Sequence, residues 1–110
     1  MQKTYEQMIR CHCASANTMA LIGGKWKIII LDHLRDGTQH FNELQRSIAG
    51  ITPHTLSQNL KELVSDGLVS RQDFKTTPPS TAYSLDTLGK ELLPILTAIT
   101  TFGENHPLIK

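Results

Sequence analysis

Acidic residues are missing from one long stretch of this chain. The sequence contains 10 Asp and Glu against 11 Lys and Arg, yet none of the acidic residues falls between Leu44 and Lys61. The formal net charge of +1 neither demands nor excludes a polyanionic partner. The deficit of carboxylates is local, so a surface built from residues 44–61 can approach a polyanion without repulsion.

Long apolar runs and cysteines are also scarce. Runs such as Ile28 to Leu31 are far too short to span a bilayer, and the N-terminal residues lack the apolar core of a signal peptide. We therefore expect a cytosolic protein with no membrane partner. Cys11 and Cys13 lie too close together to staple a fold and are expected as thiols. A chain of 110 residues can still bury its own core, so we expect one domain over 1–110.

The segment from Ile51 to Gly67 carries signals for both ends of a helix. Thr52 suits the N-cap, Pro53 suits the first helical position, and Gly67 suits the left-handed residue that ends a helix. At about 100° of rotation per residue, the apolar side chains between these ends fall on one stripe. The residues of that stripe are Leu56, Leu60, Leu63 and Val64.

The opposite face of this helix offers hydrogen-bond donors. Because Arg, Lys, Asn and Gln pair with base edges in the DNA major groove, we interpret the segment as a recognition helix. On this segment alone, an ordinary amphipathic helix with a solvated polar face is the alternative. Gln58 is the strongest candidate for a bidentate contact to adenine, whereas Asn59 has an equally good alternative role in bonding within the domain. The base-contact candidates are Thr52, His54, Thr55, Gln58 and Asn59.

The neighbouring segments predict a winged helix around the recognition helix. Helical spacing predicts earlier helices over residues 14–22, 25–34 and 41–48. A tight connection at 49–51 contains Gly50 and joins the third of these to the recognition helix, as a helix-turn-helix requires. Alternating residues over 68–85, interrupted by a loop with two prolines, predict a β-hairpin that forms the wing.

A last helix, capped by Asp86, has an apolar stripe wider than so small a domain can cover. Pro94 should kink this helix, because it cannot donate to the fourth carbonyl back. Dimerisation is the simplest outlet for the stripe, whose interface candidates are Leu92, Ile95, Leu96, Ile99 and Phe102. The predicted fold is α+β and mostly α: a winged helix-turn-helix core over 25–85, flanked by helices within 1–24 and 86–110, of which the apolar stripe assigns the second to dimerisation.

Basic side chains around the recognition helix are assigned to DNA phosphates. The phosphate candidates are Lys25, Lys27, Arg46, Lys61, Arg71 and Lys75. Trp26 is expected in the core rather than as a stacking platform. The histidines are scattered and no paired carboxylates appear, so we expect no enzyme, no cofactor and no metal site. A winged-helix module for protein contacts remains the alternative to a DNA-binding protein.

The sequence Cys11-His12-Cys13 permits three interpretations. Two thiols and an imidazole can contribute to a metal site, but the second ligand pair of a structural zinc site is lacking. Cys11 can instead be a redox-sensing thiolate, favoured by Arg10 and by a nearby helix N-terminus. Inert thiols are the third interpretation.

The chain carries the motifs Leu21-Ile-Gly-Gly-Lys-Trp-Lys, Phe41-Asn-Glu-Leu, Leu56-Ser-Gln-Asn-Leu-Lys-Glu-Leu, Asp66-Gly-Leu-Val-Ser-Arg and Tyr83-Ser-Leu. Taken together, these motifs resemble those of the HxlR-type winged-helix transcriptional regulators of bacteria, relatives of the multiple-antibiotic-resistance regulators. The resemblance implies a homodimer, built from the first and last helices, that regulates transcription from a palindromic operator. It also implies an oxidant or small-molecule effector, sensed at a cysteine that matches Cys11.

Overall fold

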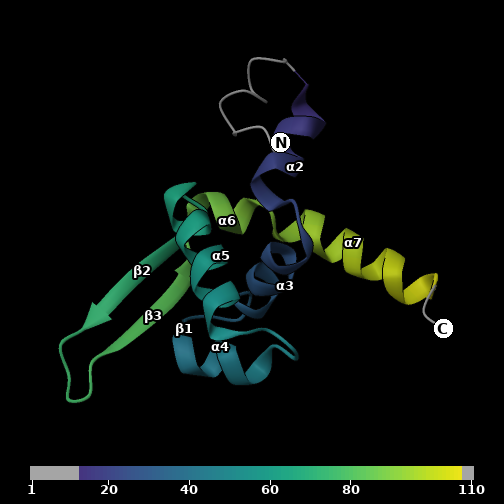
Figure 1. The fold of residues 1–110 in the computed structure, drawn as a ribbon. Helices are drawn as coiled ribbons and strands as arrows, with labels where there is room; N and C mark the ends of the chain where they lie inside the picture. The colour runs from purple at the N-terminus through teal and green to yellow at the C-terminus, as the bar shows by residue number, and fades with distance from the viewer. Residues whose placement is uncertain (1–12, 108–110) are drawn as a thin grey trace.

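The computed structural model describes residues 13–107, which form a mostly helical fold with one small sheet (Figure 1). The elements, in order, are α2 (Ala14–Ile22), α3 (Lys25–His33), β1 (Gln39–His40), α4 (Phe41–Ser47), α5 (Pro53–Ser65), β2 (Val69–Phe74), β3 (Ser80–Leu85), α6 (Thr87–Glu91) and α7 (Leu93–Asn105). This order confirms the predicted α+β winged helix-turn-helix. No helix in this part of the chain is long and apolar enough to cross a membrane.

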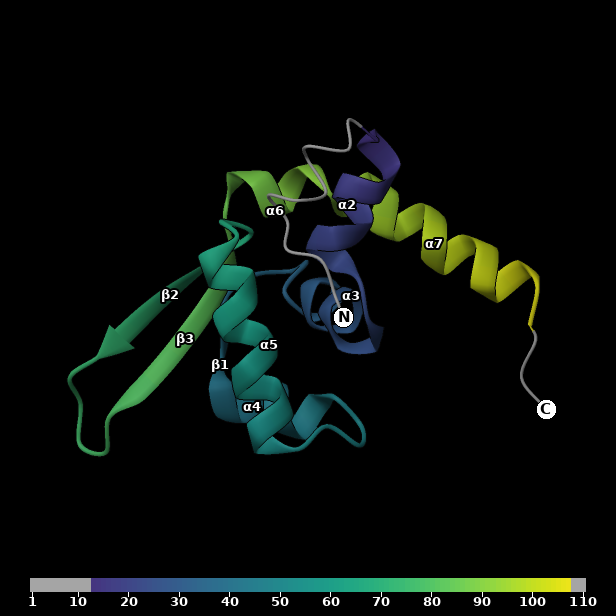
Figure 2. The same cartoon turned by 45° about the horizontal axis from the view of Figure 1, so that its top comes forward.

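The wing is a hairpin of β2 and β3, and β1 adds a third antiparallel strand. The strand order is β1-β3-β2, with Gln39 opposite Tyr83 and Val69 opposite Leu85. Figures 1 and 2 show the hairpin extending away from the helices, with the loop between β2 and β3 at its far end. The base of the wing is therefore fixed in the protein while its tip is free to contact a partner.

The core lies where α3 packs across α5. Ile30 and Leu31 from α3 and Leu56, Leu60 and Leu63 from α5 are each fully buried. These leucines belong to the predicted apolar stripe of the recognition helix. The three leucines of α5 are buried and Val64 is partly buried, which leaves the other face of α5 toward solvent, as the 3.6-residue period requires.

The predicted last helix is broken into α6 and α7. Asp86 caps α6 as predicted, with its carboxylate accepting from the Thr87 N–H at 2.9 Å. The break falls at Leu92, and Pro94 stands in the first turn of α7, where the missing N–H costs nothing. Pro94 therefore stands at the start of a separate helix rather than at a kink inside one helix, and α7 leaves the body on the side away from the wing (Figure 2).

Candidate nucleic-acid interface

The start of α5 is fixed by local hydrogen bonds. Gly50, with φ of +81°, turns the chain between α4 and α5. Thr52 caps α5, since its Oγ1 accepts from the Thr55 N–H at 3.1 Å and its hydroxyl donates to Thr55 Oγ1 at 2.9 Å. The Gln45 amide on α4 donates to the Ile51 carbonyl at 2.6 Å and so holds the turn to α4. Sequence reasoning missed this role of Gln45.

The exposed face of α5 carries most of the predicted donors. His54, Gln58 and Lys61 are exposed, and Thr55 is half-buried beside the cap. Asn59 differs, because it is half-buried and its amide donates to the Thr55 carbonyl at 2.8 Å. Its amide nitrogen therefore serves the helix itself, which is the alternative role expected for it.

Lys27 does not lie on the surface as a phosphate ligand. Its side chain is only 9% exposed and its Nζ lies 2.8 Å from Glu62 Oε1, which joins α3 to α5. The other carboxylate oxygen, Glu62 Oε2, accepts from the Gln58 amide at 3.0 Å. Packing of α3 against α5 thus buries the stem of Lys27 beside a carboxylate, a position that disfavours the phosphate contact predicted for this residue.

Glu62 also shows that the exposed face of α5 is not free of carboxylates. It lies one turn after Gln58 and contacts that side chain directly. The pKa of Glu62 is lowered, first by the hydrogen bond from Lys27 and then by that from Gln58. The carboxylate is therefore ionised, but Lys27 neutralises its charge.

The wing presents a second set of polar residues beside α5. Arg71 on β2 pairs with Asp73 at 3.1 Å, and Asp73 also accepts from the Thr81 hydroxyl at 3.1 Å. Lys75 is exposed at the end of β2. Lys61 and Arg71 line one hollow of about 300 Å³ between α5 and the wing. This hollow brings cations from two elements together, although Asp73 offsets part of the Arg71 charge.

The remaining basic candidates lie on the first helices of the winged core. Lys25 and Arg46 are exposed, at the start of α3 and the end of α4. The Lys25 ammonium lies 4.6 Å from the centre of the Trp26 ring, a cation–π distance. Trp26 is partly buried and packs against the core, as predicted.

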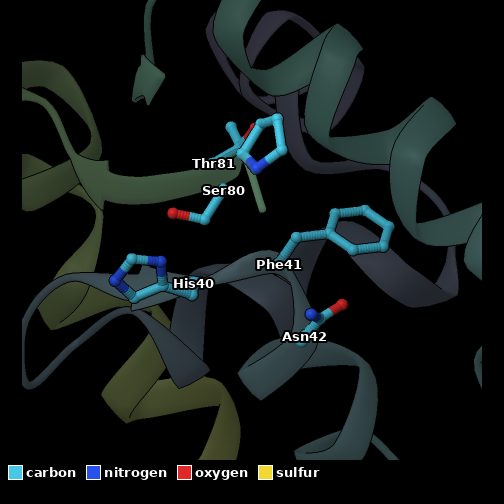
Figure 3. A pocket seen from close by; sticks show the side chains of 6 residues that line it. His40, Phe41, Asn42, Ser80 and Thr81 are labelled. Carbon is cyan, nitrogen blue, oxygen red and sulfur yellow. The ribbon is translucent and has the colours of Figure 1, made fainter. Parts of the chain in front are cut away.

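A hollow of about 230 Å³ lies where α4 begins beside the start of β3. Figure 3 shows the His40 ring and the Ser80 hydroxyl on one side of it, with the Phe41 ring pointing to the other side. His40 is the one titratable side chain among the residues that line it.

A family model described as HxlR-like helix-turn-helix matches residues 21–108, which include every element from α3 to α7. The chain belongs to this HxlR-like family. The match runs through the recognition helix and the wing, the two elements that carry most of the predicted site.

Curated relatives and solved structures agree with the family. The chain is 39% identical over 94 residues to an uncharacterized HTH-type transcriptional regulator of Bacillus subtilis (strain 168), YdeP, covering 86% of this chain and 73% of that protein. The oxidised form of the redox regulator HypR matches with TM-score 0.83 and 38% identity, covering 88% of this chain and 100% of that one. The reduced form of the B. subtilis transcriptional regulator YodB matches with TM-score 0.73 and 27% identity, over 87% and 95% of the two chains. This HxlR-like chain is thus a helix-turn-helix transcriptional regulator and not an enzyme.

Cys13 lies at the N-cap of α2, whereas Cys11 lies outside the described residues. The Cys13 thiol is exposed, and the pKa of that thiol is lowered, first by the hydrogen bond from the backbone at Ala16 and then by the Ser15 hydroxyl. The Sγ and Ser15 Oγ atoms are 3.6 Å apart. The helix N-terminus that sequence reasoning invoked for Cys11 therefore acts on Cys13.

The apolar stripe of the last helices divides into two parts. Leu92 and Leu96 are 7% and 0% exposed, so these two of the predicted interface residues are covered within the protomer itself. Ile95, Ile99 and Phe102 are 42%, 43% and 62% exposed. These three residues of α7, called here the α7 face, remain without cover in the described part of the chain.

Proposed function

We propose that this HxlR-like regulator acts as a homodimer that binds a palindromic DNA operator. The observation that carries the proposal is the exposed N-terminal half of α5. There, between Thr52 and Lys61, the helix offers donors and no carboxylate, and the first carboxylate that follows is neutralised by Lys27. A recognition helix contacts base edges through such N-terminal residues.

Individual contacts follow from exposure. We assign base contacts to Gln58, His54 and the Thr52–Thr55 cap, and leave Asn59 to the helix. Lys61, Lys75, Arg71, Lys25 and Arg46 are assigned to phosphates, with Arg71 the weakest because it is paired with Asp73. These contacts position the protein, while Gln58 gives it sequence preference.

The dimer is proposed from the α7 face together with the helices at the N-terminal end. A regulator of a palindrome needs two recognition helices about 34 Å apart, on successive major grooves of one DNA face. The exposed Ile95, Ile99 and Phe102 give a second copy an apolar surface to cover. Because the proposed partner is DNA, we place the proposed site of action in the cytoplasm.

An oxidant response is proposed for the thiols Cys11 and Cys13. The similar structures include a redox regulator, HypR, in an oxidised form and YodB after diamide treatment. The lowered pKa of Cys13 raises the thiolate fraction available to an oxidant. Unchanged operator binding after diamide treatment of the wild type argues against this response, and Cys11→Ser and Cys13→Ser assign it to one thiol.

The experiment that tests DNA binding is a titration of salt. A dimer with about eight phosphate contacts should lose about 10³-fold or more in affinity between about 50 and 200 mM salt. Lys61→Ala should weaken binding to every sequence and lower the salt slope by about 2 per dimer, since each lost contact contributes about 0.9. A mobility-shift assay with the DNA upstream of the protein's own gene, or of the adjacent divergent gene, measures both the affinity and the salt slope.

Lys90→Ala is the matched control, because Lys90 is exposed on α6, outside the proposed interface. It should leave the slope unchanged. A protein that shifts no duplex, or one for which Lys61→Ala and Lys90→Ala have equal slopes, instead fits the alternative, a winged-helix module for protein contacts.

A further inference from the structure

Glu62 links the core to the exposed face of α5. Its Oε1 atom is 2.8 Å from the Lys27 ammonium, and its Oε2 atom accepts from the Gln58 amide at 3.0 Å. The Lys27 side chain is 9% exposed and that of Glu62 is 46% exposed, so one end of these contacts is anchored in the protein. The other end is the side chain proposed to contact a base.

The chemistry of the carboxylate decides which way the Gln58 amide faces. An ionised carboxylate has no hydrogen to donate, so only the NH₂ group of Gln58 can face Glu62. The amide oxygen of Gln58 then points away from Glu62. One acceptor oxygen and one remaining N–H are left for a partner of α5.

We propose that Glu62 is a positioning residue for base specificity, which holds Gln58 with its amide oxygen outward so that α5 selects a base bearing an exocyclic amino group. The proposal rests on the DNA-binding function proposed above and adds the residue that fixes the orientation of the Gln58 amide. Adenine presents its N7 acceptor beside an amino donor in the major groove, whereas guanine presents N7 beside a keto oxygen. The free N–H of Gln58 suits N7 of either purine, but its fixed oxygen suits only the amino group of adenine.

Lys27 makes this arrangement compatible with DNA. Without Lys27, the Glu62 carboxylate would be an uncompensated negative charge on the helix proposed to approach DNA. Held by Lys27, the carboxylate orients Gln58 while its charge is neutralised. The lowered pKa of Glu62 accords with both contacts.

The sharpest test is Glu62→Gln in the full-length protein, because this substitution keeps the size of the side chain. The new amide has one oxygen for Lys27, so its NH₂ group faces Gln58 and requires the Gln58 oxygen. Gln58 then turns its own NH₂ outward, where it donates to a guanine keto oxygen. We expect the ratio of affinities for adenine over guanine at one position of each half-site to fall about tenfold.

The wild type is first used to select binding sites from random duplexes. The affinities for adenine and for guanine are then measured at every position of the selected half-site. Gln58→Ala should remove the preference for adenine over guanine at the same position. In the Gln58→Ala background, Glu62→Gln should then leave this ratio of affinities unchanged. Ser65→Ala, at an exposed position late in the same helix, is the control and should keep the wild-type ratio. Thermal melting verifies that each variant is folded, and Glu62→Ala, which frees the Gln58 amide, should lower the ratio by a smaller factor.

The outcomes separate this proposal from the proposed function. An unchanged ratio in Glu62→Gln, or a change that persists in the Gln58→Ala background, overturns the role of Glu62 and leaves DNA binding intact. Failure of the wild type to select any sequence overturns both.

Discussion

α5 and α7 are two helices of equal length, but the fold buries the apolar face of α5 and leaves much of that of α7 exposed. Each has 13 residues and a proline in its first turn. α5 buries Leu56, Leu60 and Leu63 completely and turns a polar face outward. α7 buries Leu96 alone and leaves apolar side chains on its outer face.

The difference teaches what amphipathicity does and does not specify. The leucines of the α5 stripe are buried in one cluster with Ile30 and Leu31 of α3, so a single chain covers the apolar face of α5. The stripe of α7 is wider than the surface available to it, and Figure 1 shows the helix projecting from the body. A helix of the first kind presents a surface for a polar partner, whereas one of the second kind fits an apolar partner such as a second copy.

Truncation of the buried face of α5 should have the largest effect. Leu60→Ala truncates a fully buried side chain of the hydrophobic core, and we expect it to cost about 3 kcal/mol of the free energy of unfolding. Urea denaturation at fixed protein concentration measures the loss. Ser65→Ala, on the solvent face of the same helix, should stay within about 0.5 kcal/mol of wild type. A loss below about 1 kcal/mol for Leu60→Ala would mean that the stripe is not the core of the fold.

A charge on the α7 face should act on assembly rather than on the fold of the protomer. Ile99→Glu places a carboxylate on the surface proposed to be covered by a second copy, so the mass by light scattering should fall from twice 12.3 kDa to 12.3 kDa. Operator affinity should fall about 100-fold or more, since one half-site alone is then bound.

Thr101→Glu adds the same charge at an exposed position of α7 outside the α7 face and is the matched control. It should remain dimeric. A wild type that is already monomeric, or a dimer that survives Ile99→Glu, removes the assembly proposed for α7.

The sequence predicts α5 well because its signals are local. Thr52, Pro53 and Gly67 fix the ends of the helix through backbone geometry, and the leucine stripe fixes its buried face. The contact of Gln58 with Glu62 is also visible in the sequence, since residues four apart share a helix face. The acid-free stretch ends at Lys61, one residue before this carboxylate.

The sequence is a weaker guide where tertiary packing decides which side chains are buried. Lys27 looks like any basic residue at a helix start, and only the crossing of α3 over α5 turns it inward toward Glu62. Leu92 and Leu96 share a period with Ile95 and Ile99, so the sequence does not say which of them the protomer covers. Gly89 shows the same limit, because a Cβ there would overlap the Leu68 carbonyl, an approach that no local pattern reveals.

The smallest predicted effect tests whether the polar side of α5 contributes to stability through Lys27 and Glu62. The folded pKa of Glu62 is lowered, first by the bond from Lys27, so the folded state binds this proton less tightly than the unfolded state. The pair therefore stabilises the fold above the ordinary glutamate pKa of about 4.3, and that stability is lost as the pH falls through the lowered value. Asp66 acts in the opposite sense, because burial raises its pKa and its protonation favours the folded state.

Melting temperature from about pH 6 to about pH 3 measures this difference. Glu62→Gln should lose less stability over that interval than wild type does, by a small margin because Glu62 is half-exposed and screened by water. Glu91→Gln, the same change at an exposed position on α6, should follow the wild-type curve. Identical curves for wild type and Glu62→Gln would limit Glu62 to orienting Gln58, whereas a difference shows that one carboxylate serves both the core and the exposed face of α5.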